Sequence, residues 1–237
     1  MREEPCYSEA FYRSTQSDSC IIDLATDKKI LLDQVNPPIC WPRIFGNENP
    51  VEIEVGCGRG RFLLEAAKRC PEINYLGIER APKYIRRTQM RFLKHIKHTG
   101  SLRGKSKSLP FSNVRLVWSD AAYFVDRYLP EDTVKAYHVY FPDPWPKKRQ
   151  HKRRLFRSEL WLQGFTRTLY PRGGRLYLAT DYEEYFLEIC ARLSQSKTVV
   201  EKPLDLSEID RIQTNFEMRY LAEGRKIYRA MYEKHEM

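Results

Sequence analysis

Apolar and polar residues alternate along most of this chain in a way that predicts strands and helices in regular succession. Short segments that are mostly apolar, or that alternate apolar and polar residues as 51–55 does, predict strands at residues 51–55, 74–78, 114–118, 135–141 and 175–180. Apolar residues at three- and four-residue spacing predict helices at residues 61–69, 82–97, 121–128, 155–170 and 182–194. This order predicts an α/β fold, with a parallel sheet wound with helices on both faces.

The two ends of the chain and one internal segment depart from this pattern. Residues 1–20 are polar and predict an arm, while the prolines within residues 30–44 predict an extended lead-in. Residues 98–110 contain glycines, serines and lysines, which is typical of a mobile loop. Further strand candidates are residues 198–201, 213–219 and 227–232. We therefore expect an arm and lead-in at 1–49 and one domain at 50–237.

The first predicted strand ends in a glycine-rich turn that opens a helix, Gly56-Cys57-Gly58-Arg59-Gly60. Such a turn brings backbone N–H groups close to a ligand. Dinucleotide enzymes use the spacing G-x-G-x-x-G, whereas here the third glycine comes one residue early and bulky Arg61 follows it. Glu54 precedes the turn and suits the cationic amino-acid end of S-adenosylmethionine. A tight turn without a ligand is the alternative.

Four carboxylates fall at or near the ends of successive predicted strands: Glu54, Glu79, Asp120 and Asp143. Glu79 fits an acceptor for ribose hydroxyls or an exposed glutamate, and Asp120 fits an adenine-amine acceptor or a helix N-cap. Asp143 lies between two prolines, so it is either held rigidly for chemistry or part of a plain proline turn. Ligands bind outside the carboxyl ends of strands in such sheets. We therefore expect a shared pocket, with Asp143 at its deepest point between cofactor and substrate.

The formal net charge of +10 changes this picture by suggesting a polyanionic partner, nucleic acid before membrane. Seven lysines and arginines gather after the fourth strand: Lys147, Lys148, Arg149, Lys152, Arg153, Arg154 and Arg157. We favour phosphate binding for this run over a solvated face or a nuclear import signal. The six cysteines have no metal-site spacing, so we expect reduced thiols and no metal. We also expect no membrane span and no signal peptide.

Five segments together resemble the bacterial tRNA (guanine-N7)-methyltransferases: residues 54–60, 77–79, 141–147, 180–183 and 214–217. The Phe-Pro-Asp-Pro-Trp-Pro-Lys segment with its basic continuation is the most specific of them. The resemblance implies a class I methyltransferase (Rossmann-like) fold, doubly wound, with a mostly parallel seven-stranded sheet and an antiparallel last strand. It also implies S-adenosylmethionine as cofactor and methylation of a guanine N7 in the variable loop of tRNA.

Carried onto this sequence, the resemblance also implies roles for individual residues. The cofactor site would contain Glu54, Gly56, Gly58, Glu79, Asp120 and Asp143, with Asp143 also catalytic. The substrate would contact Lys147, Asp181, Thr214, Asn215, Phe216 and Glu217. The RNA backbone would contact Lys148, Arg149, Lys152, Arg153 and Arg154. The family's arginine-rich N-terminal segment is not evident in residues 1–45. We expect a cytoplasmic monomer or homodimer that acts without an obligate protein partner.

Two other classes of function fit the same residues. An Asp-Pro-x-aromatic turn can also hold an exocyclic amine, which would make the protein an amino-group methyltransferase acting on nucleic acid. A basic RNA-binding module with a vestigial cofactor pocket is the non-enzyme alternative, and the set of strand-end acids argues against it. The glycine spacing disfavours a dehydrogenase.

Overall fold

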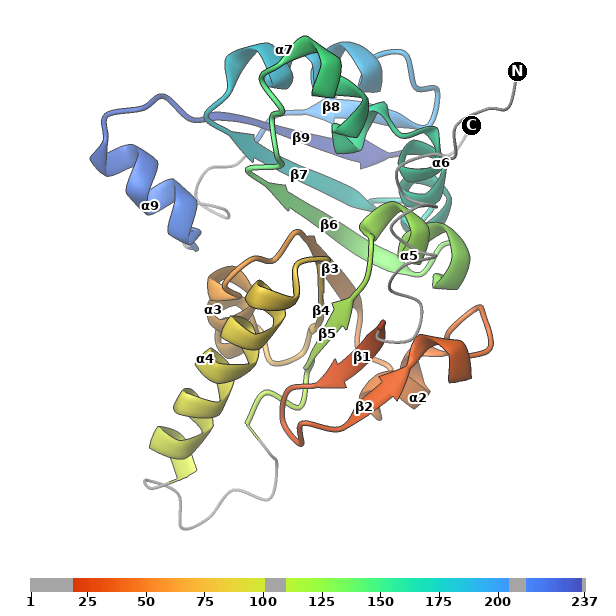
Figure 1. Ribbon diagram of the computed structural model, residues 1–237. Coiled ribbons are helices and arrows are strands. Elements are labelled where there is room, and N and C mark those ends of the chain that lie inside the picture. Colours follow the sequence, from red (N-terminus) through yellow and green to blue (C-terminus); the bar gives the residue numbers. More distant parts are fainter. Residues whose placement is uncertain (1–18, 101–109, 205–211, 236–237) are drawn as a thin grey trace.

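A computed structural model describes residues 19–100, 110–204 and 212–235, which form a mixed sheet with helices packed against it (Figure 1). Nine strands among these residues follow the order β2-β1-β5-β4-β3-β6-β7-β9-β8. The strands are β1 (Cys20–Asp23), β2 (Lys29–Leu31), β3 (Val51–Val55), β4 (Asn74–Glu79), β5 (Val114–Trp118), β6 (Val134–Tyr140), β7 (Arg175–Thr180), β8 (Val199–Lys202) and β9 (Tyr228–Lys234).

Five parallel strands form the centre of the sheet, with β3 in the middle between β4 and β6. Strand β5 pairs in parallel with β4, and β7 pairs in parallel with β6. The carboxyl ends of all five therefore meet at one edge, where open α/β sheets bind ligands. The doubly wound, mostly parallel sheet is confirmed, and β9 is the expected antiparallel strand, since it runs against both β7 and β8.

Helices cover both faces of this sheet. They are α2 (Trp41–Phe45), α3 (Arg61–Arg69), α4 (Pro82–Gly100), α5 (Ala121–Tyr128), α6 (Glu159–Thr168), α7 (Glu183–Leu193) and α9 (Asn215–Ala222), with 3-10 turns η1 (Leu32–Gln34), η2 (Lys148–Arg153) and η3 (Leu155–Arg157). Leu63 of α3 and Phe92 of α4 belong to one apolar cluster, whereas Trp161 of α6 and Tyr185 of α7 belong to another. No helix of the described ranges is long and apolar enough to cross a membrane.

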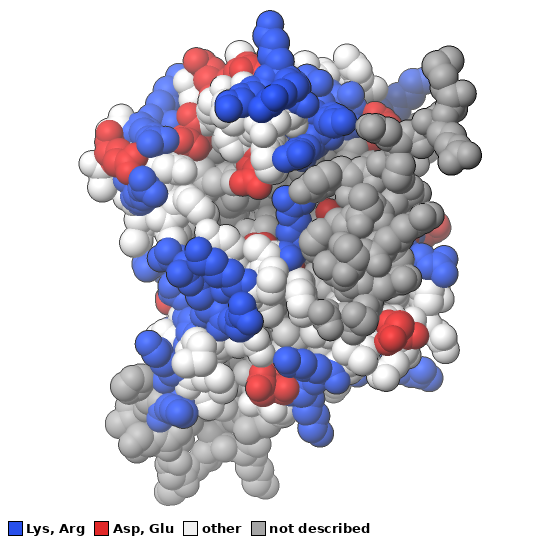
Figure 2. All heavy atoms as spheres, in the orientation of Figure 1, with Lys and Arg blue, Asp and Glu red and all other residues white. Residues whose placement is uncertain are grey.

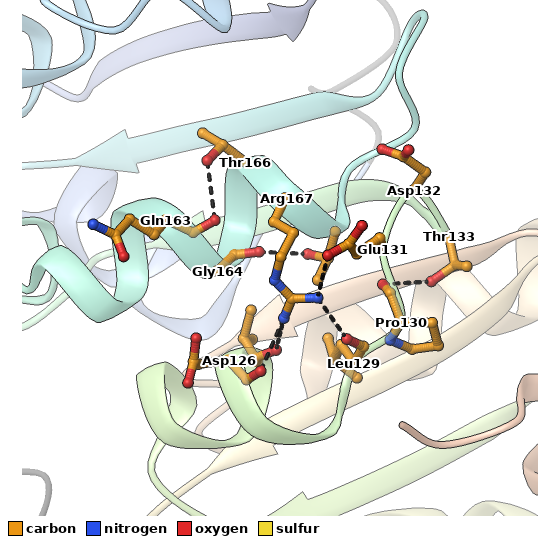
Figure 3. A network of polar contacts seen from close by, with 12 residues as sticks. Asp126, Leu129, Pro130, Glu131, Asp132, Thr133, Gln163, Gly164, Thr166 and Arg167 are labelled. Atoms are coloured by element: carbon orange, nitrogen blue, oxygen red, sulfur yellow. Dashed lines mark hydrogen bonds and ion pairs between the residues drawn. The ribbon is translucent and has the colours of Figure 1, made fainter. Parts of the chain in front are cut away.

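Helices α5 and α6 are joined through Arg167, near the end of α6 (Figure 3). Its guanidinium donates hydrogen bonds to the carbonyl oxygens of Val125, Asp126 and Leu129 at 3.3, 2.9 and 3.1 Å. The last carbonyls of a helix have no partners within that helix. Arg167 therefore caps the end of α5 and fixes the position of α6 beside it.

The lead-in before residue 50, expected to be extended, contains two strands of the sheet and a short helix. Strand β1 pairs antiparallel with β5, and β2 pairs antiparallel with β1. These two strands enlarge the sheet from the predicted seven strands to nine among the described residues. Trp41 and Phe45 of the short helix α2 are buried in the main core. The signal in β1 is a run of only four residues, too short to separate from a loop by periodicity.

Two element types near the basic run and the C-terminus also differ from the sequence prediction. Residues 155–158 form a 3-10 turn and a cap, so the helix begins at Glu159 rather than at 155. The strand predicted at 213–219 is the helix α9, whose cap Thr214 accepts a hydrogen bond from the Glu217 N–H at 3.1 Å. This Thr-x-x-Glu capping box was readable in the sequence. The loop predicted at 98–110 begins inside α4, and residues 101–109 lie outside the described residues.

A buried ion pair between β3 and β6 makes stability depend on acid pH. Glu52 lies 3.0 Å from His138 Nε2 and 2.9 Å from Lys135 Nζ. Burial raises the pKa of Glu52, but the hydrogen bond and charge of His138, with the charge of Lys135, outweigh it and lower the pKa to about 2. A carboxylate with a lowered pKa stabilises the folded state at pH values above its ordinary pKa of 4.5. This stabilisation is lost as the pH falls towards 2.

We therefore expect the free energy of unfolding to fall by about 3 kcal/mol between pH 6 and pH 2 through Glu52 alone. Urea unfolding across this range, for the wild type and Glu52→Gln, measures the effect. The variant should be less stable at neutral pH and should have a flatter acid limb. Glu72→Gln, at an exposed position, is the matched control. Parallel pH curves for wild type and Glu52→Gln would contradict the prediction.

Candidate active site

The glycine-rich turn after β3 is fixed to the end of β4. Gly56, Gly58 and Gly60 all have positive φ, at 73°, 54° and 64°, a backbone conformation that favours glycine. The Gly58 N–H donates to Glu79 Oε2 at 3.0 Å, and the Ala81 N–H donates to Glu79 Oε1 at 2.8 Å. A Cβ on Gly60 would lie 2.5 Å from Thr88 Cγ2. The turn is therefore shaped by glycine and packed directly against α4.

Two adjoining cavities open at this edge of the sheet, with volumes of about 260 and 340 Å³. Gly56, Gly58, Tyr84, Tyr140 and Phe216 line both. The first also contains Glu54, Cys57, Arg59, Arg61, Phe62, Thr214, Asn215 and Arg219. The second also contains Glu79, Asp120, Phe141, Asp143, Trp145 and Arg153. The structure thus brings the four strand-end carboxylates together around one composite cleft.

The three acids deepest in this cleft are poorly solvated. Burial, with the nearby charge of Glu79, raises the pKa of Glu54 well above its usual range. Its Oε2 is buried and has no hydrogen-bond partner among the described residues. Burial also raises the pKa values of Glu79 and Asp120, against the hydrogen bonds that both accept from backbone N–H groups. Asp120 caps α5 by accepting a hydrogen bond from the Tyr123 N–H at 3.2 Å. It therefore acts as a helix cap and also lines the cleft.

Asp143 lies on a strained loop at the rim of the cleft. Phe141 and Trp145, on either side of the Pro-Asp-Pro segment, have positive φ values of 53° and 43°. Such values in residues other than glycine cost about 1–3 kcal/mol and occur where the surroundings fix them. The Asp143 side chain is exposed, so the expectation that it lies at the deepest point is wrong. Asp143 follows the end of β6 by three residues, where the chain has left the sheet. The acid at the bottom of the cleft is instead the buried Glu54.

The basic run after Asp143 divides into exposed residues and one buried residue. Lys147, Lys148, Arg149, Lys152 and Arg153 are exposed, and the Arg153 guanidinium lies 5.0 Å from the centre of the Trp145 ring.

Arg154 is only 1% exposed. Its Nε donates to the Pro144 carbonyl oxygen at 2.7 Å, and its Nη1 pairs with Glu184 and Glu188 of α7. Its assignment to the RNA backbone is therefore wrong, because carboxylates from another helix already neutralise it inside the protein.

The C-terminal segment predicted to contact substrate has two different positions. Asn215 and Phe216 line the cleft, together with the cap residue Thr214. Glu217 is buried and pairs with Arg229 of β9, and Asp181 pairs with Arg225 at 2.8 Å. These two ion pairs connect α9 and the turn after it to β7 and β9.

Several cleft residues were missed from the sequence. Tyr84, Tyr140 and Arg219 line the cleft, and Arg61 donates to the Gln213 carbonyl oxygen at 3.0 Å beside it. Tyr140 could have been found from its position near the end of the strand predicted at 135–141. Tyr84 and Arg219 carry no signal in the sequence, because their role depends on how α4 and α9 pack.

A family model described as "Putative methyltransferase" matches residues 48–230. A tRNA (guanine-N(7)-)-methyltransferase of Geobacter metallireducens is 31% identical over 210 residues, which are 85% of this chain and 90% of that protein. Enzymes with the same name from Alkalilimnicola ehrlichii and Syntrophotalea carbinolica are 33% and 32% identical. The match to the Alkalilimnicola enzyme covers 84% of this chain and 78% of that protein. The match to the Syntrophotalea enzyme covers 81% of this chain and 77% of that protein.

Solved structures show the same fold at low sequence identity. The 16S rRNA methyltransferase KamB superposes with a TM-score of 0.55 at 13% identity, over 91% of this chain and 99% of that one. An antibiotic-related methyltransferase superposes with a TM-score of 0.53 at 19% identity, over 90% and 98% of the two chains. The fold is therefore that of class I methyltransferases. With the family match and its relatives, these findings show that the chain belongs to the tRNA (guanine-N(7)-)-methyltransferase family.

Proposed function

We propose that this protein transfers the methyl group of S-adenosylmethionine to N7 of a guanine in tRNA. The observation that supports this most is the cleft itself. Four carboxylates from the ends of β3, β4, β5 and β6 surround a glycine turn, in a chain whose relatives are enzymes of this name. We propose further that it acts as a monomer or homodimer in the cytoplasm and has no obligate protein partner.

The residues of the cleft fit this cofactor. The buried Glu54 carboxylate has a free oxygen, which suits a cationic amino group. Glu79 suits ribose hydroxyls, and Asp120, beside the small residues Ala121 and Ala122, suits an adenine amine. The backbone of Gly56 and Gly58 permits close approach. When bound, S-adenosylmethionine supplies an electrophilic methyl group on a sulfonium.

The chain's contribution to the reaction is positioning and charge stabilisation. Guanine N7 already has a lone pair, so no residue need remove a proton before transfer. The cleft walls would place the base in line with the methyl group, which is the main source of acceleration in such a reaction. Methylation makes the guanine cationic, and the Asp143 carboxylate can stabilise that charge or accept hydrogen bonds from the base. Asn215 and Phe216 would border a base turned out of its stack.

Methyl transfer to unmodified tRNA tests the proposal. The protein is incubated with tRNA and methyl-labelled S-adenosylmethionine, and the RNA is digested to nucleosides. Label in 7-methylguanosine is the expected result. Label in an amino-methylated nucleoside would move the reaction to the other methyltransferase class. No label, with no cofactor binding, would leave an RNA-binding protein.

Glu54 should dominate cofactor affinity. A hydrogen bond to a charged group contributes about 1.5–3 kcal/mol, so Glu54→Gln should weaken S-adenosylmethionine binding about 10- to 100-fold. Isothermal titration calorimetry measures this, with exposed Glu48→Gln as the control. Equal affinities for Glu54→Gln and the wild type would remove Glu54 from the cofactor site.

A further inference from the structure

Helix α4 carries a stripe of positive charge on the face turned away from the core. Lys83, Arg87, Arg91 and Lys94 follow one another at three- and four-residue spacing, which places them on one side of the helix, and Arg86 lies three residues after Lys83. The buried residues Ile85, Thr88 and Phe92 lie on the opposite side. We name this stripe, together with Arg59 of the glycine turn, the α4 surface.

Helix α4 itself has no acids to balance the charge of the α4 surface. Residues 82–100 contain no aspartate or glutamate. Within the part of the chain that the structure describes, Lys83, Arg86, Arg87, Arg91 and Lys94 make no ion pair of 4.0 Å or less. Burial, with the charges of Arg61 and Arg59, lowers the pKa of Arg91 against the opposing charge of Glu65. Like charges at this spacing repel each other and destabilise the free helix, so the arrangement favours an anionic partner.

The α4 surface forms a groove that reaches the cleft. Its six basic residues line a shallow hollow together with Met90 and His95. Arg59 also lines the first cavity of the cleft, and Tyr84, in the first turn of α4, lines both cavities. Figure 2 shows lysine and arginine side chains gathered where Figure 1 places α4. A ligand bound in this groove would therefore continue into the site of methyl transfer.

We propose that the α4 surface binds phosphate groups of the tRNA, as a backbone contact additional to the run 147–153. This inference rests on the proposed function. From Lys83 to Lys94 the helix rises by about 16 Å, enough for several phosphates spaced a few ångströms apart along a strand. Among the described residues that line the groove, Met90 is the one large apolar side chain. Protein interfaces have aromatic and apolar centres, so the composition favours a nucleic-acid backbone over an acidic protein.

The test compares two variants with the same change in net charge. The first carries Lys83→Gln, Arg86→Gln, Arg87→Gln and Lys94→Gln. The control carries Lys28→Gln, Lys29→Gln, Lys197→Gln and Lys202→Gln, at exposed positions near the two outer edges of the sheet. For each, tRNA affinity is measured at several salt concentrations, and S-adenosylmethionine affinity is measured as a check on the cleft.

The α4 variant should bind tRNA at least 10-fold more weakly than the control at low salt. The slope of log affinity against log salt should fall by about one for each phosphate that the variant no longer neutralises. Cofactor affinity should be unchanged in both. Equal tRNA affinity and equal slopes for the two variants would overturn the proposal and leave the surface to an acidic protein or to solvent. Binding is read separately from methyl transfer, so failure of the wild type to form 7-methylguanosine would count against the proposed function alone.

Discussion

An Asp143→Ala variant should transfer methyl groups about 10²- to 10³-fold more slowly than the wild type while binding tRNA with similar affinity. This is the range found when one preorganised group that stabilises transition-state charge is removed. The side chain is exposed at the cleft rim and is not part of the core, so the fold should persist. Single-turnover transfer at saturating tRNA and cofactor measures the chemical step apart from binding.

A second substitution at the same position separates the two roles open to this carboxylate. Asp143→Asn removes the charge but keeps one oxygen that can accept a hydrogen bond from the base. If charge stabilisation dominates, Asn should be as slow as Ala, whereas orientation of the base would leave Asn clearly faster. Asp33→Asn, at an exposed position on η1, is the control. Wild-type rates for both Asp143 variants would remove it from the reaction.

The central sheet and the set of strand-end acids could be predicted because their signals are local. The strand 51–55 alternates apolar residues with glutamates and is followed directly by the glycine-rich turn, and the structure begins and ends β3 at the same residues. Once the strands are parallel, topology alone brings Glu54, Glu79 and Asp120 to one edge. No further knowledge of side-chain packing was needed to place these three residues near each other.

What the sequence did not predict depends on partners far away in the chain. Residues 20–23 become a strand because the edge of β5 is available to them, about 95 residues later. Asp143 is exposed because Pro142 and the strained Phe141 turn the chain out of the sheet, and no periodicity reports such a turn. Arg154 resembles its basic neighbours in sequence and differs from them in being buried, through its hydrogen bond to the Pro144 carbonyl oxygen and its pairs with Glu184 and Glu188 of α7.

Arg154→Met should lower the free energy of unfolding by about 3 kcal/mol. Removing one partner of a buried ion pair costs about 3–5 kcal/mol because the other charge stays buried. The lower end applies here, since Glu188 still pairs with Arg157 and Glu184 is half exposed. The substitution also removes the hydrogen bond to the Pro144 carbonyl oxygen, next to Asp143. We therefore expect slower methyl transfer as well, measured beside denaturant unfolding.

The neighbouring residue supplies the control for this prediction. Arg153→Met changes the same charge one position earlier, where the side chain is exposed, and should leave stability within about 0.5 kcal/mol. It should instead weaken tRNA binding and lower its salt dependence. If Arg154→Met kept full stability and bound tRNA weakly, as Arg153→Met should, then Arg154 would be an RNA contact like the rest of the basic run.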